Sequence, residues 1–301
     1  MHERIFALSN LHRATVIDHI LERLLLIFCR SPEAVSLELG DSESTEGEQD
    51  ALALLERVYP EFRERIRGLR VLDFGCGTGH QTAAFAEIGA AEVVGVDINS
   101  EWRRRASALA TQRGIADRVR FVSRISAEDA GRFDFVFSQN SMEHFPNPEQ
   151  ALREMANALA PNGRLLVTFG LPWYAPYGAH MHYFTKIPWV HLIFPERVIM
   201  RVRSRYKADG ARSYVDVEGG LNKMSLKKFK QLLHDSGLRV EKFATEPVKG
   251  QQWLARLPGL SEFFTNHVTA VLFPAVTEGY SGATTRALDE TKLAPAVSRR
   301  Y

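Results

Sequence analysis

Three closely spaced glycines are the feature of this sequence that most directly suggests a binding site. Gly75, Gly77 and Gly79 follow the apolar run 70–74 and precede a helical pattern, in the segment VLDFGCGTGH. Because glycine has no Cβ, such a loop can turn sharply and bring its backbone against a ligand. A dinucleotide-binding loop has the spacing GxGxxG, whereas His80 stands here at the place of the third glycine. The segment predicts a ligand-binding loop, with a tight strand–helix turn that binds no ligand as the alternative.

Two carboxylates accompany this loop. Asp97 lies at the end of the next apolar run, about twenty residues further on, where an acidic side chain can accept hydrogen bonds from both hydroxyls of a ribose. The following Ile-Asn-Ser is also good capping chemistry, so the alternative for Asp97 is a helix N-cap. Asp73 stands at the end of the first run, where it can bind the amides of the loop.

The elements that must position these residues alternate along the chain. Apolar runs predict strands at residues 70–74, 92–96, 119–122, 133–138 and 164–169. Helical patterns between them predict helices at 83–88, 101–114 and 148–160. Repeated strand–helix–strand units with nearly continuous apolar strands imply an α/β fold, a doubly wound parallel sheet covered by helices on both faces. In such a sheet, ligands bind beyond the carboxyl ends of the strands.

The remaining segments suggest a division of the chain into five parts. Helices are predicted at 11–30 and 49–59, with an exposed loop at 40–47, so residues 1–67 form an N-terminal helical segment before a core at 68–170. Residues 171–224 break the pattern, and a long irregular insertion of this kind is usually a lid or binding segment. Ser225 then caps a helix at 226–236, strands follow at 238–243 and 267–273 within 225–280, and 281–301 is a loose tail.

The compact GxGxG loop with Asp73 resembles motif I of class I S-adenosylmethionine-dependent methyltransferases. Residues 133–138 and the following Met142-Glu143-His144-Phe145 resemble the fourth-strand region of the type-11 methyltransferase group, and Pro161-Asn162-Gly163 resembles its approach to the fifth strand. The resemblance implies a Rossmann-like, seven-stranded sheet, mostly parallel with an antiparallel last strand, and S-adenosyl-L-methionine as cofactor. It implies cofactor contacts at Asp73, Gly75, Cys76, Gly77, Gly79, Asp97, Ile98, Ser126 and Gln139. One departure is the segment Ser123–Asp129, which lacks the group's adenine-binding Asp directly after the third strand.

Histidines near the predicted acceptor side could act as a general base. His144 follows the fourth strand, and His180 and His182 lie in the insertion; histidine is the usual base for a hydroxyl because its pKa lies near working pH. For each one alone, a structural role is the alternative. Glu143-His144 resembles part of the metal-binding Glu-x-x-Glu-His of ubiquinone-biosynthesis-type O-methyltransferases, but Asn140 replaces the first Glu, and no metal is assigned.

These patterns together favour methyl transfer, at oxygen, to a small-molecule or glycan-type acceptor. The alternative is a regulatory or scaffold protein that binds S-adenosylmethionine without transferase activity. An oxidoreductase that uses NAD is disfavoured by His80 and by the absence of a Tyr-x-x-x-Lys pair in the expected region. The aromatic residues of the insertion could line the acceptor pocket or could pack the insertion onto the core.

Composition sets limits on partners. A net charge of +2 and a pI near 8.5 give no support for nucleic-acid binding. Cys29 and Cys76 have no metal-binding spacing, and no leader is visible at the N-terminus, so we expect a reducing, cytoplasmic location. Arg197, Arg201 and Arg205 form a basic helical stripe near the apolar residues 187–194. The stripe could bind an anionic acceptor or give peripheral contact with an anionic membrane, with a solvated helix face as the alternative. The oligomeric state does not follow from the sequence.

Overall fold

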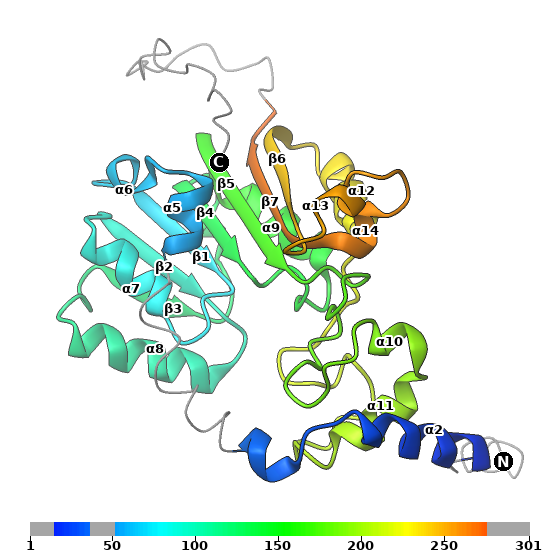
Figure 1. Cartoon of the computed structure of the whole chain (residues 1–301). Helices are drawn as coiled ribbons and strands as arrows, with labels where there is room; N and C mark the ends of the chain where they lie inside the picture. Colours follow the sequence, from blue (N-terminus) through cyan, green and yellow to red (C-terminus); the bar gives the residue numbers. More distant parts are fainter. Residues whose placement is uncertain (1–14, 37–51, 276–301) are drawn as a thin grey trace, which may run out of the picture.

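The computed structural model describes residues 15–36 and 52–275, which form an α/β fold around one seven-stranded sheet (Figure 1). The strand order is β3-β2-β1-β4-β5-β7-β6. The strands are β1 (Arg70–Phe74), β2 (Glu92–Val96), β3 (Val119–Val122), β4 (Phe133–Gln139), β5 (Leu159–Gly170), β6 (Arg239–Pro247) and β7 (Thr265–Phe273). β1 to β5 pair in parallel, and β7 pairs antiparallel with both β5 and β6. The predicted Rossmann-like sheet with an antiparallel last strand is confirmed.

Helices cover both faces of the sheet because the strands carry apolar side chains on both sides. On one face, α5 (Ala53–Val58), α6 (Phe62–Arg65), α7 (His80–Glu87) and α8 (Ser100–Gln112) bury a core that includes Phe62, Phe85 and Phe137. On the other, α9 (Pro148–Ala158) and α12 (Leu226–Asp235) pack on Val136 and Phe169. Two short helices, α13 (Gln252–Ala255) and α14 (Ser261–Phe264), lead from β6 to β7.

Helix ends follow local capping chemistry. Asn99 caps α8, and its side chain accepts hydrogen bonds from the N–H groups of Glu101 and Trp102, so the alternative role of Asp97 as N-cap is wrong. Ser225 caps α12 as predicted. The helix predicted at 148–160 ends earlier, at Ala158, because β5 begins at Leu159.

The insertion and the first helix together form a second unit, which we call the cap (residues 16–36 and 171–221). It contains α2 (Val16–Ile27), α10 (Val190–Ile193) and α11 (Glu196–Arg203), and it lies beyond the carboxyl ends of the parallel strands (Figure 1). The cap has its own apolar core, in which Leu25 and Val35 meet Phe184, Ile199 and other residues of the insertion. Helix α2 therefore packs on the insertion, although the sequence analysis placed it with the helix at 49–59 in one segment, 1–67.

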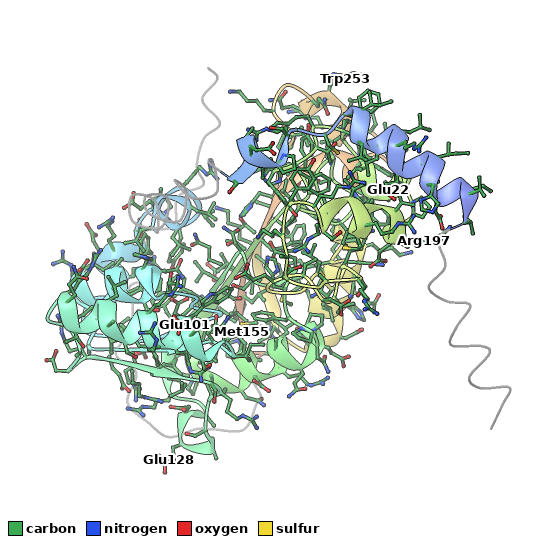
Figure 2. The ribbon with its side chains drawn as sticks, turned by 90° about the horizontal axis from the view of Figure 1, so that it is seen from below. Glu22, Glu101, Glu128, Met155, Arg197 and Trp253 are labelled. Carbon is green, nitrogen blue, oxygen red and sulfur yellow. The ribbon has the colours of Figure 1, made fainter. Side chains whose placement is uncertain are left out.

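Ion pairs join α2 to α11. Arg197 bonds to Asp18 at 2.9 Å, while Arg201 and Arg205 approach Glu22 at 3.5 and 2.8 Å. Figure 2 shows Glu22 and Arg197 on these two neighbouring helices. Helix α11 ends at Arg203, so Arg205 lies beyond it. The predicted basic stripe thus has acidic partners within the chain.

Several predicted segments lie outside the described residues, namely the first part of the helix at 11–30, the loop at 40–47, the start of the helix at 49–59 and the tail at 281–301. In the part of the chain that the structure describes, no helix is both long enough and apolar enough to cross a membrane. Nor do three His, Cys, Asp or Glu side chains of that part come together as they would around a metal ion.

Candidate cofactor and acceptor site

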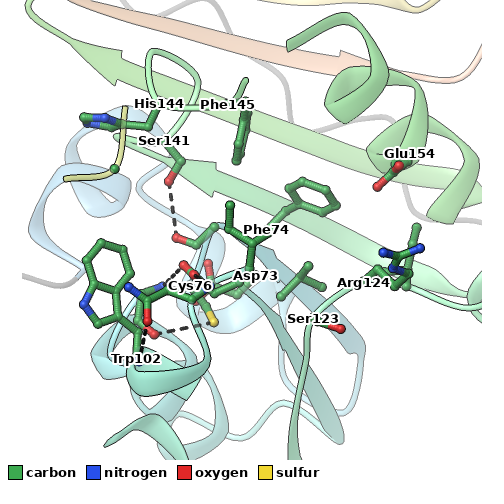
Figure 3. Close-up of a pocket in the computed structure, with 18 of the residues that line it drawn as sticks. Asp73, Phe74, Cys76, Trp102, Ser123, Arg124, Ser141, His144, Phe145 and Glu154 are labelled. Atoms are coloured by element: carbon green, nitrogen blue, oxygen red, sulfur yellow. Dashed lines mark hydrogen bonds between the residues drawn. The ribbon is translucent and has the colours of Figure 1, made fainter. Parts of the chain in front are cut away.

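A cavity of about 1310 Å³ opens where β1, β2 and β4 end (Figure 3). The glycine loop and Asp97 form one side, and the segment after β3 forms another. The cap contributes Val215, Glu218, Gly219 and Gly220. This is the position at which open α/β sheets bind their ligands.

The glycines of the loop have distinct roles. All three have positive φ, at +87°, +52° and +84° for Gly75, Gly77 and Gly79. A Cβ on Gly75 would lie 2.6 Å from the Oγ of Ser141, and this hydroxyl donates a hydrogen bond to the Gly75 carbonyl. Among the described residues, no atom lies within 4 Å of a Cβ built on Gly77, so its backbone faces open space in the cavity. Gly75 thus makes room for Ser141, whereas Gly77 leaves open space in the cavity that a side chain would fill.

Gly79 does not line this cavity, although the resemblance implied a cofactor contact there. A Cβ at this position would lie 2.7 Å from the Cβ of Ala106 and 3.1 Å from the ring of Phe121. The residue therefore allows α7 to begin against α8 and β3. Its absent side chain serves helix packing, the expected benefit of a glycine at such a close approach.

Asp97 connects the loop to the next turn. One carboxylate oxygen accepts a hydrogen bond from the Gly77 N–H at 3.0 Å, and the other accepts one from the Asn99 N–H at 2.8 Å. Each carboxylate oxygen has a second lone pair, so the group can accept further hydrogen bonds from a ligand in the cavity. The side chain is almost buried but lines the cavity, as a ribose-binding carboxylate must.

Asp73 is a buried carboxylate at the end of β1. It accepts hydrogen bonds from Gln81 Nε2 at 3.0 Å and from the Thr82 hydroxyl at 2.6 Å, which fixes the first turn of α7. Burial raises the pKa of Asp73 to about 6. Near neutral pH the carboxylate is charged and lines the cavity, where a cationic amino group of a ligand would be attracted.

Cys76 and Ile98 give the cavity apolar surface. Burial raises the pKa of the Cys76 thiol, so this residue is a neutral wall and no thiolate nucleophile. Ile98 lines the cavity with 78% of its surface exposed, which is high for a large aliphatic side chain. A flat aromatic group such as a nucleobase would cover it.

The segment after β3 contributes Arg124, Ile125 and Ser126 to the wall. The N–H and the hydroxyl of Ser126 both donate to Asp129 Oδ2, at 2.9 and 3.0 Å. Its donors are therefore already used, and Ser126 can contribute contact surface but no hydrogen bond from these groups. Gln139 lines the cavity at the end of β4, as expected.

Of the three candidate histidines, only His144 lines the cavity. Its Nδ1 lies 2.7 Å from the carbonyl oxygen of Gly220. A carbonyl only accepts hydrogen bonds, so Nδ1 of the neutral ring carries the proton and Nε2 keeps its lone pair. Gly219 packs on the same ring, since an added Cβ there would lie 3.3 Å from Nδ1.

His180 and His182, the two other candidates for the base, are not among the residues that line this cavity. The His180 ring meets the His144 ring edge-on, with centroids 5.5 Å apart, and burial lowers the pKa of His180 to about 4. His180 is therefore neutral behind His144. His182 is exposed and contacts the ring of Tyr177.

Glu143 is a buried acid that the sequence analysis did not assign. Burial raises its pKa to about 8, although the backbone of Gly170 hydrogen-bonds the carboxylate. Among the described residues, its Oε2 has no hydrogen-bond partner. Glu143 lies between Met142 and His144 in the sequence, and nothing in that spacing indicates that its side chain is buried.

Other wall residues were also missed, among them Trp102, Arg124, Ser141 and Glu154 (Figure 3). They come from elements far apart in the sequence, so spacing alone gives no signal. The aromatic residues of the insertion do not line this cavity. Instead, Trp173 and Phe184 pack against the core of the cap, with Trp173 edge-on to Tyr214 at 4.9 Å. This is the packing role that the sequence left as an alternative.

Comparison with known proteins gives the same family. A family model described as a methyltransferase domain matches residues 12–242, more than half of the chain. A ubiquinone biosynthesis O-methyltransferase from Xanthomonas euvesicatoria is 32% identical over 130 residues, which cover 42% of this chain and 54% of the relative. The match thus spans about half the length of this curated relative.

Two solved structures show the same fold. The cyclase SpnF has a TM-score of 0.51 at 18% identity, covering 78% of this chain and 86% of that one. A structure described as an S-adenosylmethionine dependent methyltransferase, from Listeria monocytogenes, has a TM-score of 0.50 at 16% identity, covering 75% and 98%. Because the family model spans both the glycine loop and the cap, we conclude that this chain belongs to the class I S-adenosylmethionine-dependent methyltransferases.

Proposed function

We propose that this protein transfers the methyl group of S-adenosylmethionine to a hydroxyl of a small-molecule or glycan-type acceptor that binds beside His144. The observation that carries the proposal is the continuity of the cavity from the glycine loop to His144. Pockets for one small ligand usually measure about 300–1,000 Å³. A cavity of about 1310 Å³ has space for a cofactor and a second small molecule.

When bound, the cofactor supplies an electrophilic methyl group, and the protein contributes orientation and the removal of water. Gly75 and Gly77 allow close contact with the loop backbone, Asp97 accepts hydrogen bonds from the ribose, and Asp73 attracts the amino group. His144 Nε2, with its lone pair free because Nδ1 bonds to Gly220, accepts the proton of the acceptor hydroxyl. Neutral His180 lies beside the ring and adds no positive charge to oppose this step.

The test combines a screen with a variant. Labelled S-adenosylmethionine is offered with pools of small hydroxylated metabolites, and formation of S-adenosylhomocysteine identifies the acceptor. The His144→Gln variant should then lower kcat by about 10²–10⁴-fold, the usual contribution of a general base, while cofactor affinity stays unchanged. His234→Gln, an exposed histidine on α12, is the matched control.

Two results would contradict this proposal. An unchanged kcat in His144→Gln would exclude the histidine as base. Tight cofactor binding without turnover for any acceptor pool would instead favour the alternative function, an S-adenosylmethionine-binding regulatory or scaffold protein. A protein described as a cyclase has a similar fold, so the fold alone does not determine the reaction.

A further inference from the structure

Helix α2 is amphipathic in an unusual sense, because its apolar stripe faces outward. Val16, Ile20, Leu24 and Ile27 recur at helical spacing, and between 46 and 78% of each residue is exposed. The side opposite to the stripe carries Asp18, Leu25 and Glu22, which face the insertion. In an ordinary surface helix the apolar stripe faces the core. The outward stripe of α2 therefore needs a different explanation from packing within the cap.

The acidic and basic residues of α2 also lie on different sides of the helix. Both acidic residues of the helix, Asp18 and Glu22, pair with arginines of the insertion. The exposed charged or titratable residues within 15–28 are His19 and Arg23, which lie beside the apolar stripe. The outward side of α2 thus combines aliphatic side chains with cationic or neutral polar groups, while its carboxylates face inward.

Two more exposed apolar residues belong to the same helix and its C-terminal end. Phe28 and Ile17 extend the stripe, with 60 and 66% of their surface exposed. Exposed apolar patches of this extent mark interaction sites in proteins.

We propose that the outward stripe of α2 is a membrane-binding surface that inserts into the interface of an anionic lipid bilayer. Interfacial helices of this kind combine an apolar stripe with basic residues, and they bind through buried apolar area and attraction to anionic headgroups. Arg23 supplies one charge, and Arg197 and Arg205 remain more than half exposed while paired with α2. The inference concerns where the protein is held and does not depend on the methyl-transfer step.

A second copy of the chain is a poorer fit to this surface. A helix of 12 residues is about 18 Å long, and one face of such a helix buries far less than the roughly 800 Å² per partner of a standard stable interface. A bilayer has no such requirement, because each aliphatic side chain gains separately by leaving water. The short length and the basic flank therefore favour a lipid surface.

Vesicle flotation with the full chain tests this proposal. Vesicles of phosphatidylcholine with about one-third phosphatidylglycerol should carry the wild type upward, and pure phosphatidylcholine vesicles should carry much less. The double variant Ile20→Ser/Ile27→Ser removes two exposed aliphatic side chains and should reduce binding to the anionic vesicles at least about tenfold. Val240→Ser, which changes an exposed aliphatic residue on β6, should bind like the wild type.

The outcomes separate the explanations. Unchanged thermal unfolding and cofactor affinity in the double variant would show that its loss of vesicle binding is not a folding defect. Equal flotation of the wild type and the double variant would overturn the proposal. So would a wild type that does not float but sediments as a dimer, with the double variant a monomer, because the stripe would then contact a second copy.

Discussion

Asp97 accepts hydrogen bonds from two backbone N–H groups on different elements, and this fixes its carboxylate at the cavity wall. We expect Asp97→Ala to weaken S-adenosylmethionine binding by about 1–3 kcal/mol, the cost of leaving hydroxyl partners unmet. Isothermal titration calorimetry measures this directly. Asp134→Ala is the control, because Asp134 lies near the amino end of β4 and bonds to Arg70. Unchanged affinity in Asp97→Ala would contradict the ribose contact.

Glu143 predicts a pH dependence of stability. Its pKa is raised from 4.5 to about 8 in the folded protein, so between these values the folded state binds more protons than the unfolded state. Stability therefore falls as pH rises through this window, by up to about 1.4 kcal/mol per pH unit from this group. The Glu143→Gln variant should not lose stability in this window, because glutamine does not ionise. Its unfolding temperature should match the wild type near pH 5 and exceed it near pH 8.

Thermal unfolding at pH 5 and pH 8 measures this difference. Glu149→Gln is the control and should behave like the wild type at both pH values, since Glu149 is exposed on α9. A Glu143→Gln variant whose advantage is the same at both pH values would mean that Glu143 ionises normally. The acid was visible in the sequence, but its burial was not. Gly170, whose backbone hydrogen-bonds the carboxyl group, and Asn222, whose N–H donates to the Glu143 carbonyl, reach Glu143 only in the folded chain.

At the scale of elements, the start of α7 depends on a close approach to α8. Gly79→Ala adds a Cβ that would lie 2.7 Å from Ala106, in addition to its positive φ. Gly114→Ala carries only the backbone cost, about 1–2 kcal/mol, because no described atom lies within 4 Å of the new Cβ. Gly79→Ala should lower the free energy of unfolding by about 1–3 kcal/mol more than Gly114→Ala does, because of the steric overlap with Ala106. Urea denaturation followed by circular dichroism compares the two, and equal losses would contradict the packing role.

Most of the sheet could be predicted from the sequence because the central strands are apolar runs that alternate with helical patterns. The predicted strand at 119–122 and helix start at Ser225 agree with β3 and α12. The C-terminal end of α9 was predicted two residues too late, because Leu159 and Ala160 fit a helix as well as the strand that they begin. Short apolar runs carry no periodicity that separates the two.

At the scale of the whole molecule, the sequence predicted the insertion at 171–224 but not that α2 packs on it to form the cap. Its two segments are separated by the core, and the pairing of Asp18 and Glu22 with three arginines depends on a contact between residues about 180 positions apart. The helical spacing of Val16, Ile20, Leu24 and Ile27 predicted the helix but not that this side of it is exposed. The sequence likewise located the candidate bases His180 and His182 in the insertion but not relative to His144.

Leu25 provides a test of the cap as a unit. It is fully buried in the core of the cap, whereas its neighbour Leu24 is 46% exposed. Leu25→Ala should cost about 2–5 kcal/mol in local stability, and amide hydrogen exchange in α11 should accelerate accordingly. Leu24→Ala should leave that exchange unchanged. Equal exchange of α11 in both variants would contradict a shared core between α2 and the insertion.

The central claim is that one cavity, formed by the glycine loop, Asp97 and the cap, holds the cofactor with its methyl group toward His144. A crystal structure of the protein with S-adenosylhomocysteine tests it most directly. We predict the nucleoside over Ile98, the ribose hydroxyls on Asp97, and the sulfur toward the side of the cavity that His144 lines. Density for the ligand at any other site, or a ribose turned away from Asp97, would contradict the account.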